Sequence, residues 1–356
     1  MILRPFLTIA LVLATAFPVD GLAGTKGYEF VRKDGYAYRI LSTGPLKDRI
    51  AWALDKPNGK SNPLGLLLHH LRGANDIVWA SYKPTHPHIV AALNGHKRAW
   101  GSYDLNYCGS ACLDAYQGNV RVSPVRLGVY KAKSKRKWFV MHHKFAILNR
   151  AKDGAPGNEA VLTGSFNWNE SAAEKNYENI VYIKSRKIAD AFWLEYERIG
   201  GRSNGNSEPI HDGDITAAFN AAGASFLQQR ISKAKTSILA AVWSLSISSA
   251  NNPNPIYDAL KAAAARGVHV RIATDAHKAK KRNYVSLDVV KIPVPHKKGH
   301  MHHKFMVIDQ EYVVTGSFNF VTKSFSGNFE NVVAIKSPAM AASFTDHWKA
   351  MAKMVQ

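Results

Sequence analysis

A short stretch that occurs twice constrains this chain more than any other feature. The first copy begins at Met141 and reads Met-His-His-Lys-Phe-Ala-Ile-Leu-Asn; the second begins at Met301 and reads Met-His-His-Lys-Phe-Met-Val-Ile-Asp. Each copy is followed by Thr-Gly-Ser-Phe-Asn and later by Asn-x-Glu-Asn. Internal repetition of several signatures in the same order predicts two related halves.

The spacing of these signatures shows where the halves differ. The histidines His142 and His302 lie 160 residues apart, whereas the glutamates Glu178 and Glu330 lie 152 residues apart. The first half therefore has eight extra residues, which we assign to the polar run 150–160.

Apolar periodicity predicts alternating helices and strands along most of the chain. The expected helices cover residues 62–73, 86–93, 187–199, 222–234, 253–267 and 338–354, and the expected strands cover residues 77–82, 120–129, 237–244 and 268–274. Residues 26–57 show no clear pattern, and residues 98–118 have the composition of a loop. Alternating helices and strands predict a layered α/β fold.

The clearest linker is the Gly-, Ser- and Asn-rich run Gly200–Ser207. Such a composition is typical of a connection between domains. We therefore expect a first domain over residues 24–205, which carries insertions, and a second domain over residues 206–356.

The first residues have the features of a signal peptide. Arg4 precedes an apolar run at Phe6–Phe17, and Gly21-Leu22-Ala23 is a small-x-small cleavage pattern. The alternative is an uncleaved anchor, but the run is shorter than the roughly 20 residues of a membrane span. We expect residues 1–23 to be removed, the mature protein to be exported to the periplasm or beyond, and no later transmembrane segment.

The formal net charge of +21 indicates a polyanionic partner, such as nucleic acid, an anionic membrane surface or an acidic polymer. A merely solvated, aggregation-resistant surface is the alternative. The two cysteines, Cys108 and Cys112, are four residues apart. In an exported protein this spacing favours a local disulfide, with free thiols left open.

Both repeats present the same reactive side chains in the same order. Residues i and i+2 of a strand point to one face, so each copy offers an imidazole and an ammonium together. A neutral imidazole can attack phosphorus, a protonated one can protonate a leaving oxygen, and a carboxylate can fix the tautomer of each ring. The candidate catalytic residues are His142, Lys144, Asn167, Glu178, His302, Lys304, Asn319 and Glu330, and the supporting residues are Asn149, Ser165, Asp309 and Ser317.

Histidines elsewhere raise the alternative of a metal site. The second histidines of the doublets, His143 and His303, should point to the opposite strand face, and a lysine beside each first histidine would repel a cation. Scattered histidines such as His69, His70, His86 and His88 are more often ordinary surface residues. We therefore expect no metal and no cofactor.

These residues resemble the phospholipase D superfamily, whose mark is a doubled His-x-Lys-x4-Asp motif. His302, Lys304 and Asp309 match it in full, whereas Asn149 stands in the first copy where the family has Asp. The resemblance covers residues 206–356 closely and about 120–205 of the first half, whereas residues 24–119 are only loosely alike. The second half looks most like the Nuc-type endonucleases and the mitochondrial cardiolipin hydrolases, which act as dimers of one such unit.

The resemblance implies two pseudo-symmetric units, each a mixed β-sheet flanked by helices, with the active site at their interface in a monomer that is an internal pseudo-dimer. It also implies metal-independent hydrolysis of a phosphodiester through a phosphohistidine. His142 would be the nucleophile, and His302 would be the general acid and then the general base. The Asp of the motif chiefly supports its own half, so Asn149 leaves the phosphate contacts intact.

Basic clusters precede both motifs and predict a track for a polyanionic strand. The expected substrate-binding residues are Lys135, Arg136, Lys137, Lys280, Lys281, Arg282, Lys297 and Lys298. Trp138 and Tyr284 lie within the clusters and are candidates for stacking on bases, although Trp138 is equally compatible with a core position. The first hypothesis is a nuclease acting on DNA or RNA, the second a phospholipase D acting on anionic phospholipid, and the third a non-catalytic nucleic-acid-binding protein.

Overall fold

The computed structural model describes residues 27–33, 36–55, 62–117, 119–132, 135–150, 157–280, 284, 287–294 and 298–355. The expected signal peptide lies outside the described residues. So do Lys281, Arg282 and Lys297, as well as the side chains of Lys135, Arg136 and Lys137.

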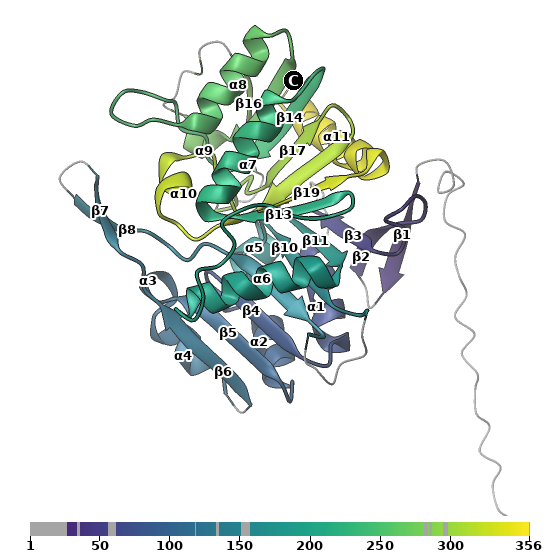
Figure 1. The fold of residues 1–356 in the computed structure, drawn as a ribbon, viewed down its shortest axis with the longest axis vertical. Coiled ribbons are helices and arrows are strands. Elements are labelled where there is room, and N and C mark those ends of the chain that lie inside the picture. Colours follow the sequence, from purple (N-terminus) through teal and green to yellow (C-terminus); the bar gives the residue numbers. More distant parts are fainter. Residues whose placement is uncertain are drawn as a thin grey trace, which may run out of the picture.

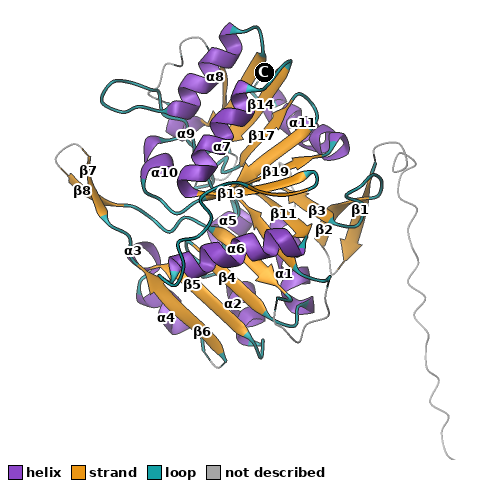
Figure 2. Ribbon diagram, viewed as in Figure 1, coloured by secondary structure: helices purple, strands orange, loops and turns teal. Residues whose placement is uncertain are grey.

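Two large mixed sheets form the framework of the described chain (Figure 2). The nine-stranded sheet has the order β1 (Tyr28–Lys33), β2 (Tyr36–Leu41), β3 (Ile50–Leu54), β11 (Asn179–Lys184), β10 (Ala160–Gly164), β9 (Lys144–Leu148), β4 (Ile77–Ser81), β5 (Ala99–Asp104) and β6 (Val120–Val125). The eight-stranded sheet has the order β12 (Ile210–Asp212), β13 (Ile215–Phe219), β19 (Asn331–Lys336), β18 (Tyr312–Gly316), β17 (Lys304–Ile308), β14 (Ser237–Val242), β15 (His269–Asp275) and β16 (Asp288–Ile292).

The two sheets share one topology. Strands β3-β11-β10-β9-β4-β5-β6 of the first sheet correspond in order to β13-β19-β18-β17-β14-β15-β16 of the second. In each sheet the last three of these strands are parallel, and the others pair antiparallel. The predicted fold class, two pseudo-symmetric α/β units, is confirmed.

A layer of two helices lies between the sheets and joins them. Helix α6 (Arg186–Ile199) places Phe192 5.0 Å from the ring of Phe145 in the first sheet and 4.9 Å from that of Phe219 in the second. Helix α11 (Pro338–Lys353) packs on the second sheet, and its Ser343 hydroxyl accepts a hydrogen bond from the Trp52 indole of the first. The halves therefore share a buried apolar centre.

Other helices cover the outer faces (Figure 1). The first sheet packs against α1 (Asn62–Gly73) and α2 (Pro87–Asn94), and the second against α7 (Asn220–Ser232) and α8 (Pro255–Ala265). The hairpin β7–β8 (Val129–Ala132 and Lys135–Trp138) projects from the body just before the first motif. No helix in the described ranges has both the length and the apolar composition that a membrane span requires.

Most predicted elements are confirmed, but the loop expected over residues 98–118 is wrong. This segment contains β5, α3 (Leu105–Cys108) and α4 (Ser110–Ala115). The sequence of β5 is Ala-Trp-Gly-Ser-Tyr-Asp, and its Gly and Ser are typical of loops. The segment is nevertheless a strand that is buried between two parallel neighbours. Residues 26–57, which show no clear pattern, contain β1, β2 and the fully buried β3.

The extra residues of the first half lie where the spacing predicts. The connection from β9 to β10 runs from residue 149 to 159, whereas Asp309, Gln310 and Glu311 alone connect β17 to β18. The insertion lies at the strand ends that are remote from the histidines, so it leaves the equivalent positions of the two motifs unchanged.

Candidate active site

The two motifs meet where the sheets face each other. The backbone N–H of His142 donates to the carbonyl of Phe329, and that of His302 donates to the carbonyl of Tyr177, both at 2.9 Å. Each carbonyl belongs to the residue just before the glutamate of the opposite half. These backbone bonds set the register in which each histidine faces the other half. The strands β9 and β17 begin two residues later, so the histidines precede the strands rather than lie within them.

The histidines and glutamates pair crosswise between the halves. His142 Nδ1 lies 2.9 Å from Glu330 Oε2, and His302 Nδ1 lies 2.8 Å from Glu178 Oε1. Both carboxylates are fully buried. A carboxylate that accepts a hydrogen bond from Nδ1–H fixes the tautomer in which Nε2 carries the lone pair.

Each glutamate is held by its own half. Ser165 Oγ donates to Glu178 Oε2 at 2.6 Å, and Asn176 Nδ2 donates to Oε1 at 3.1 Å. The matching donors to Glu330 are Ser317 and Asn328. The repeated serine and asparagine therefore orient the carboxylate that the opposite imidazole needs.

A second layer of polar side chains ties the halves together beneath the site. Thr163 Oγ donates to Asn331 Oδ1 at 2.8 Å, and Asn179 Nδ2 donates to Thr315 Oγ at 2.7 Å. The second histidines of the doublets, His143 and His303, lie fully buried in this layer. His143 Nε2 is 2.7 Å from Glu195, and His303 Nε2 is 2.8 Å from His347 Nε2.

Two buried lysines flank the imidazoles. Lys144 and Lys304 are 1% and 3% exposed. Burial and the charge of Lys304 lower the pKa of Lys144 to about 7. Burial lowers the pKa of Lys304 to about 8, although Glu178 and Glu330 oppose this shift. A bound anion would restore the charge of both groups.

The imidazoles are poised in the neutral form. Burial lowers the pKa of His142 to about 3, reinforced by Lys144 and opposed by Glu330. Burial, Lys304 and Lys144 lower the pKa of His302 well below its usual value. An anionic substrate between the rings would favour protonation of one of them.

Both rings line one cavity of about 300 Å³. Asn167 and Asn319 also line it, and the Oδ1 atom of each is buried without a hydrogen-bond partner. The other lining residues are Tyr82, Tyr107, Val140, Asn169, Ser171, Asn176, Trp243, His300, Lys323 and Asn328. Imidazoles and amides from both halves, together with the Lys323 ammonium group, thus converge on a space that suits a phosphate group.

Aromatic residues that the sequence does not single out form the walls. Tyr82 follows β4 and Trp243 follows β14, so they occupy matching positions. The Tyr82 ring lies 5.4 Å from the His142 ring, and the Trp243 ring lies 5.1 Å from the His302 ring. Their only signal in the sequence is an aromatic residue directly after a buried strand.

The last positions of the motifs lie at the remote ends of their strands. Asp309 accepts hydrogen bonds from the backbone N–H groups of Lys235, Thr236 and Ser237. Asn149 accepts one from the N–H of Asn75 and donates its amide to the Asn158 carbonyl. An amide can therefore take the place of the carboxylate as a brace within the first half.

The basic residues expected to bind substrate are only partly described. Lys280 and Lys298 are exposed and do not line the cavity. Tyr284 is buried, and its hydroxyl donates to the Leu245 carbonyl, so its expected role in stacking is wrong. Trp138 is 40% exposed, with the Arg126 guanidinium 5.7 Å from its ring centre.

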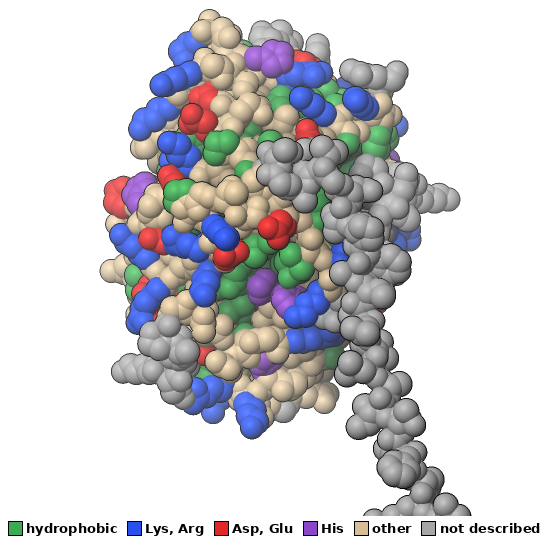
Figure 3. Space-filling model, turned by 90° about the vertical axis from the view of Figure 1, so that its right-hand side faces the viewer, with side chains coloured by type: hydrophobic (Ala, Val, Ile, Leu, Met, Phe, Trp, Pro, Cys, Tyr) green, Lys and Arg blue, Asp and Glu red, His purple; other side chains and the backbone are tan. Residues whose placement is uncertain are grey.

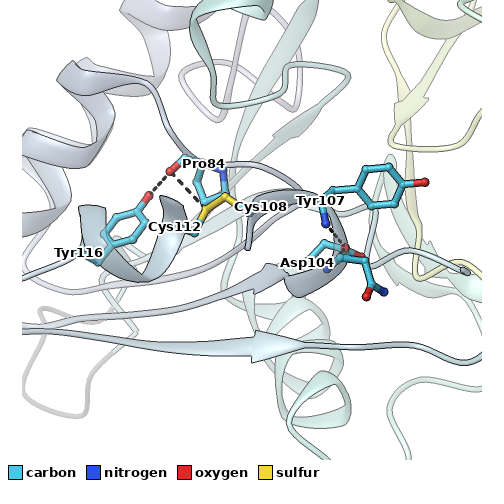
Figure 4. Close-up of a disulfide and its surroundings, with 7 residues drawn as sticks. Pro84, Asp104, Tyr107, Cys108, Cys112 and Tyr116 are labelled. Atoms are coloured by element: carbon cyan, nitrogen blue, oxygen red, sulfur yellow. Dashed lines mark hydrogen bonds between the residues drawn. A yellow bond between two sulfur atoms is a disulfide. The ribbon is translucent and has the colours of Figure 1, made fainter. Parts of the chain in front are cut away.

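The structure joins Cys108 to Cys112 in a disulfide between α3 and α4 (Figure 4). The described residues include no group of three or more His, Cys, Asp or Glu side chains arranged to hold a metal ion.

Comparison with known proteins gives the family. The protein-family model described as "Cardiolipin synthase, PLD-like domain" matches residues 77–199 and 227–352, which is well over half of the chain. A phospholipase D of Rickettsia prowazekii (strain Madrid E) is 31% identical over 181 residues, 48% of this chain and 80% of that protein. The mitochondrial cardiolipin hydrolase of Xenopus tropicalis is 35% identical over 79 residues, 22% of this chain and 34% of that protein.

A solved structure shows the same architecture across the chain. The phosphatidylserine synthase of Haemophilus influenzae Rd KW20 covers 86% of both chains with a TM-score of 0.59, although the sequences are 11% identical. The family match extends over both halves, and the two motifs meet in one cavity. The chain therefore belongs to the PLD-like family of the phospholipase D superfamily.

Proposed function

We propose that this protein is a metal-independent phosphodiesterase that cleaves nucleic acid through a phosphohistidine on His142. This proposal rests chiefly on the crosswise pairing of His142 with Glu330 and of His302 with Glu178 around one cavity. This pairing leaves Nε2 of each ring as the reactive atom.

The chemistry proceeds in two displacements. His142 Nε2 attacks phosphorus, the bond to the leaving oxygen breaks, and His302 supplies the proton that this oxygen takes. Water then attacks phosphorus, His302 takes a proton from that water, and the P–N bond breaks to release a phosphomonoester and neutral His142. Lys144 and Lys304 stabilise the charge on the non-bridging oxygens in both steps.

An asymmetry between the halves supports this assignment of roles. The backbone N–H of Glu178 donates to the Asp55 carboxylate, whereas that of Glu330 donates to the Asn220 amide oxygen. A nearby negative charge favours protonation. The Glu178–His302 pair should therefore hold a proton more readily, which suits the general acid. Burial also raises the pKa of Glu178 to about 8, whereas His142 and Lys144 outweigh burial and lower the pKa of Glu330 to about 2.

The placement of basic groups favours a substrate that extends beyond one phosphate. Lys323 lines the cavity, and the projecting β7–β8 hairpin carries Lys131, Lys135, Arg136 and Lys137 in its sequence. On the face shown in Figure 3, basic side chains are scattered among acidic ones over both lobes, so net charge alone does not define a track. A lysine at the catalytic cavity and a basic hairpin just before the first motif are features that suit a nucleic-acid strand.

A second candidate is a phospholipase D that releases phospholipid head groups. It is favoured by the relatives named phospholipase D and mitochondrial cardiolipin hydrolase. The same two-step chemistry applies, and only the groups on the phosphate differ. A third candidate, a non-catalytic nucleic-acid-binding protein, leaves the paired imidazoles without a role.

One experiment compares the three candidates. Purified protein in EDTA is incubated with single-stranded DNA, RNA and anionic phospholipid vesicles. The nuclease proposal predicts cleavage of nucleic acid that His302→Ala abolishes. Head-group release with intact nucleic acid would establish the phospholipase instead, and binding that His302→Ala leaves unchanged, without turnover of either substrate, would establish the third.

We also propose that the protein is exported and acts as a monomer with domains at 24–205 and 206–356. The Cys108–Cys112 disulfide supports export, because such bonds persist in oxidising compartments. The shared site between the two halves supports a monomer. Fractionation of cells and light scattering of the purified protein test these points.

A further inference from the structure

The two walls of the catalytic cavity differ although their backbones correspond. Asp104 and Asp275 are the last residues of the parallel strands β5 and β15, and each caps a short helix and accepts a hydrogen bond from the residue before a catalytic histidine. The third residue after each aspartate is Tyr107 in the first half and Lys278 in the second. At this position the first half therefore has a phenol ring that lines the cavity, and the second half has an ammonium group beside Trp243, which lines it.

The Tyr107 ring is open to a planar partner. It lines the cavity, is 47% exposed, and lies 5.0 Å from the Tyr82 ring, which in turn contacts His142. On the opposite wall, Lys278 Nζ lies 4.3 Å over the Trp243 ring and occupies that face. An aromatic platform on one side and a cation on the other suit a base and a neighbouring phosphate, respectively.

A disulfide fixes the position of this platform. Tyr107 directly precedes Cys108, which is bonded to Cys112. Cys112 and Tyr116 both contact the Pro84 carbonyl in the segment that follows Tyr82. In Figure 4 the Tyr107 ring points away from this cluster. The bond thus holds α3, which carries Tyr107, to α4, and the contacts of Cys112 and Tyr116 with Pro84 join this unit to the segment that follows Tyr82.

We propose that Tyr107 stacks on a base next to the scissile phosphate, held in place by the Cys108–Cys112 disulfide, so that the protein selects single-stranded nucleic acid. The inference rests on the proposed nuclease function. The catalytic histidines are only 7% and 5% exposed, and a base reaches the Tyr107 ring only when it is unstacked from its neighbours. Duplex bases are not free to do so.

The test uses an oligothymidine strand, an abasic strand of equal length, and a duplex. Tyr107→Ala should raise KM for oligothymidine about tenfold, the scale of one lost stacking contact, with kcat little changed. It should leave KM for the abasic strand unchanged. Tyr107→Phe should behave as the original protein, and Leu113→Ala is a matched control because Leu113 is exposed on α4 but does not line the cavity.

The disulfide is tested in the same assay. Replacing both cysteines by serine, or reducing the protein, should raise KM for oligothymidine but not for the abasic strand. The inference would be overturned if Tyr107→Ala raised KM equally for oligothymidine and for the abasic strand. It would also be overturned if the original protein cleaved the duplex faster than the single strand. Failure to cleave any nucleic acid, with head groups released from vesicles, would instead overturn the proposed function.

Discussion

His142 and Glu330 are 188 positions apart in the sequence, yet Nδ1 of the histidine lies 2.9 Å from Oε2 of the glutamate. The reverse pair, His302 with Glu178, has the same geometry across the interface. Neither half alone contains a catalytic imidazole together with the carboxylate that orients it. Because each pair is divided between the halves, the site is complete only when the two halves are packed together around their shared buried centre.

The crosswise pairing makes a first prediction. Glu330→Gln keeps the size of the side chain but removes the charge that holds the His142 tautomer. We expect kcat to fall by roughly 10²- to 10⁴-fold, as when other histidines lose their orienting carboxylate. Glu197→Gln, on the exposed ion pair with Arg202, is the control. Full activity in Glu330→Gln would show that the pairing has no catalytic role.

A second prediction concerns the asymmetry at Asp55. Asp55→Asn removes a negative charge beside Glu178 and should lower the proton affinity of the Glu178–His302 pair. The general acid would then lose its proton at lower pH, so the basic limb of kcat against pH should move to lower pH. Asp48→Asn, at an exposed position, should leave it in place. A shift of the acidic limb alone would contradict the assigned roles.

A third prediction follows from the lysines. The pKa values of Lys144 and Lys304, about 7 and 8, lie below the usual value, so both groups lose charge as pH rises through this range. Attraction of an anionic substrate is greatest below these pKa values. With bis(4-nitrophenyl) phosphate, whose charge is constant between about pH 5 and 9, kcat/KM should fall as pH rises beyond about 8. A kcat/KM that stays level up to pH 10 would show that neither lysine titrates in this range.

A fourth prediction concerns stability. His70 stacks on Tyr182 at 3.8 Å, and burial lowers its pKa to about 3. Its unfolded form takes up a proton below about pH 6.5, so its stabilising effect is complete above that pH and is lost as pH falls toward 3. His70→Phe retains the stacking and removes this loss. Between pH 8 and pH 5 the free energy of unfolding should therefore fall by about 2 kcal/mol less in His70→Phe than in the original protein, as measured by urea unfolding.

Local patterns in the sequence predict much of this fold because they record local physics. The leucines of α1 and the Pro and Gly that bound α8 specify helices that need no knowledge of the partner half. The β5 strand is different, since its Gly101 lies directly against the Trp79 ring, where any side chain would clash. That requirement comes from packing between strands, so composition alone points to a loop.

The residues of the site are likewise divided into those that local sequence patterns identify and those that depend on packing between the halves. The duplicated motifs identify His142, Lys144, His302 and Lys304 and indicate that they act together. They do not show which glutamate serves which histidine, because that depends on how the sheets face each other. Tyr107 and Trp243 lie outside any repeated signature, and only the arrangement of the two halves brings them to the cavity.

The central claim is that one phosphorus atom is handled by both halves, with the covalent bond on His142. The most direct measurement is the burst of 4-nitrophenolate from bis(4-nitrophenyl) phosphate in His302→Ala, combined with mass spectrometry of the alkali-quenched protein, since the P–N bond is labile in acid. We expect one nitrophenolate released and one 4-nitrophenyl phosphoryl group retained per chain, on His142, because the good leaving group needs no acid while hydrolysis lacks its base. Labelling of both motifs in one chain, or turnover that survives in His142→Ala, would contradict it.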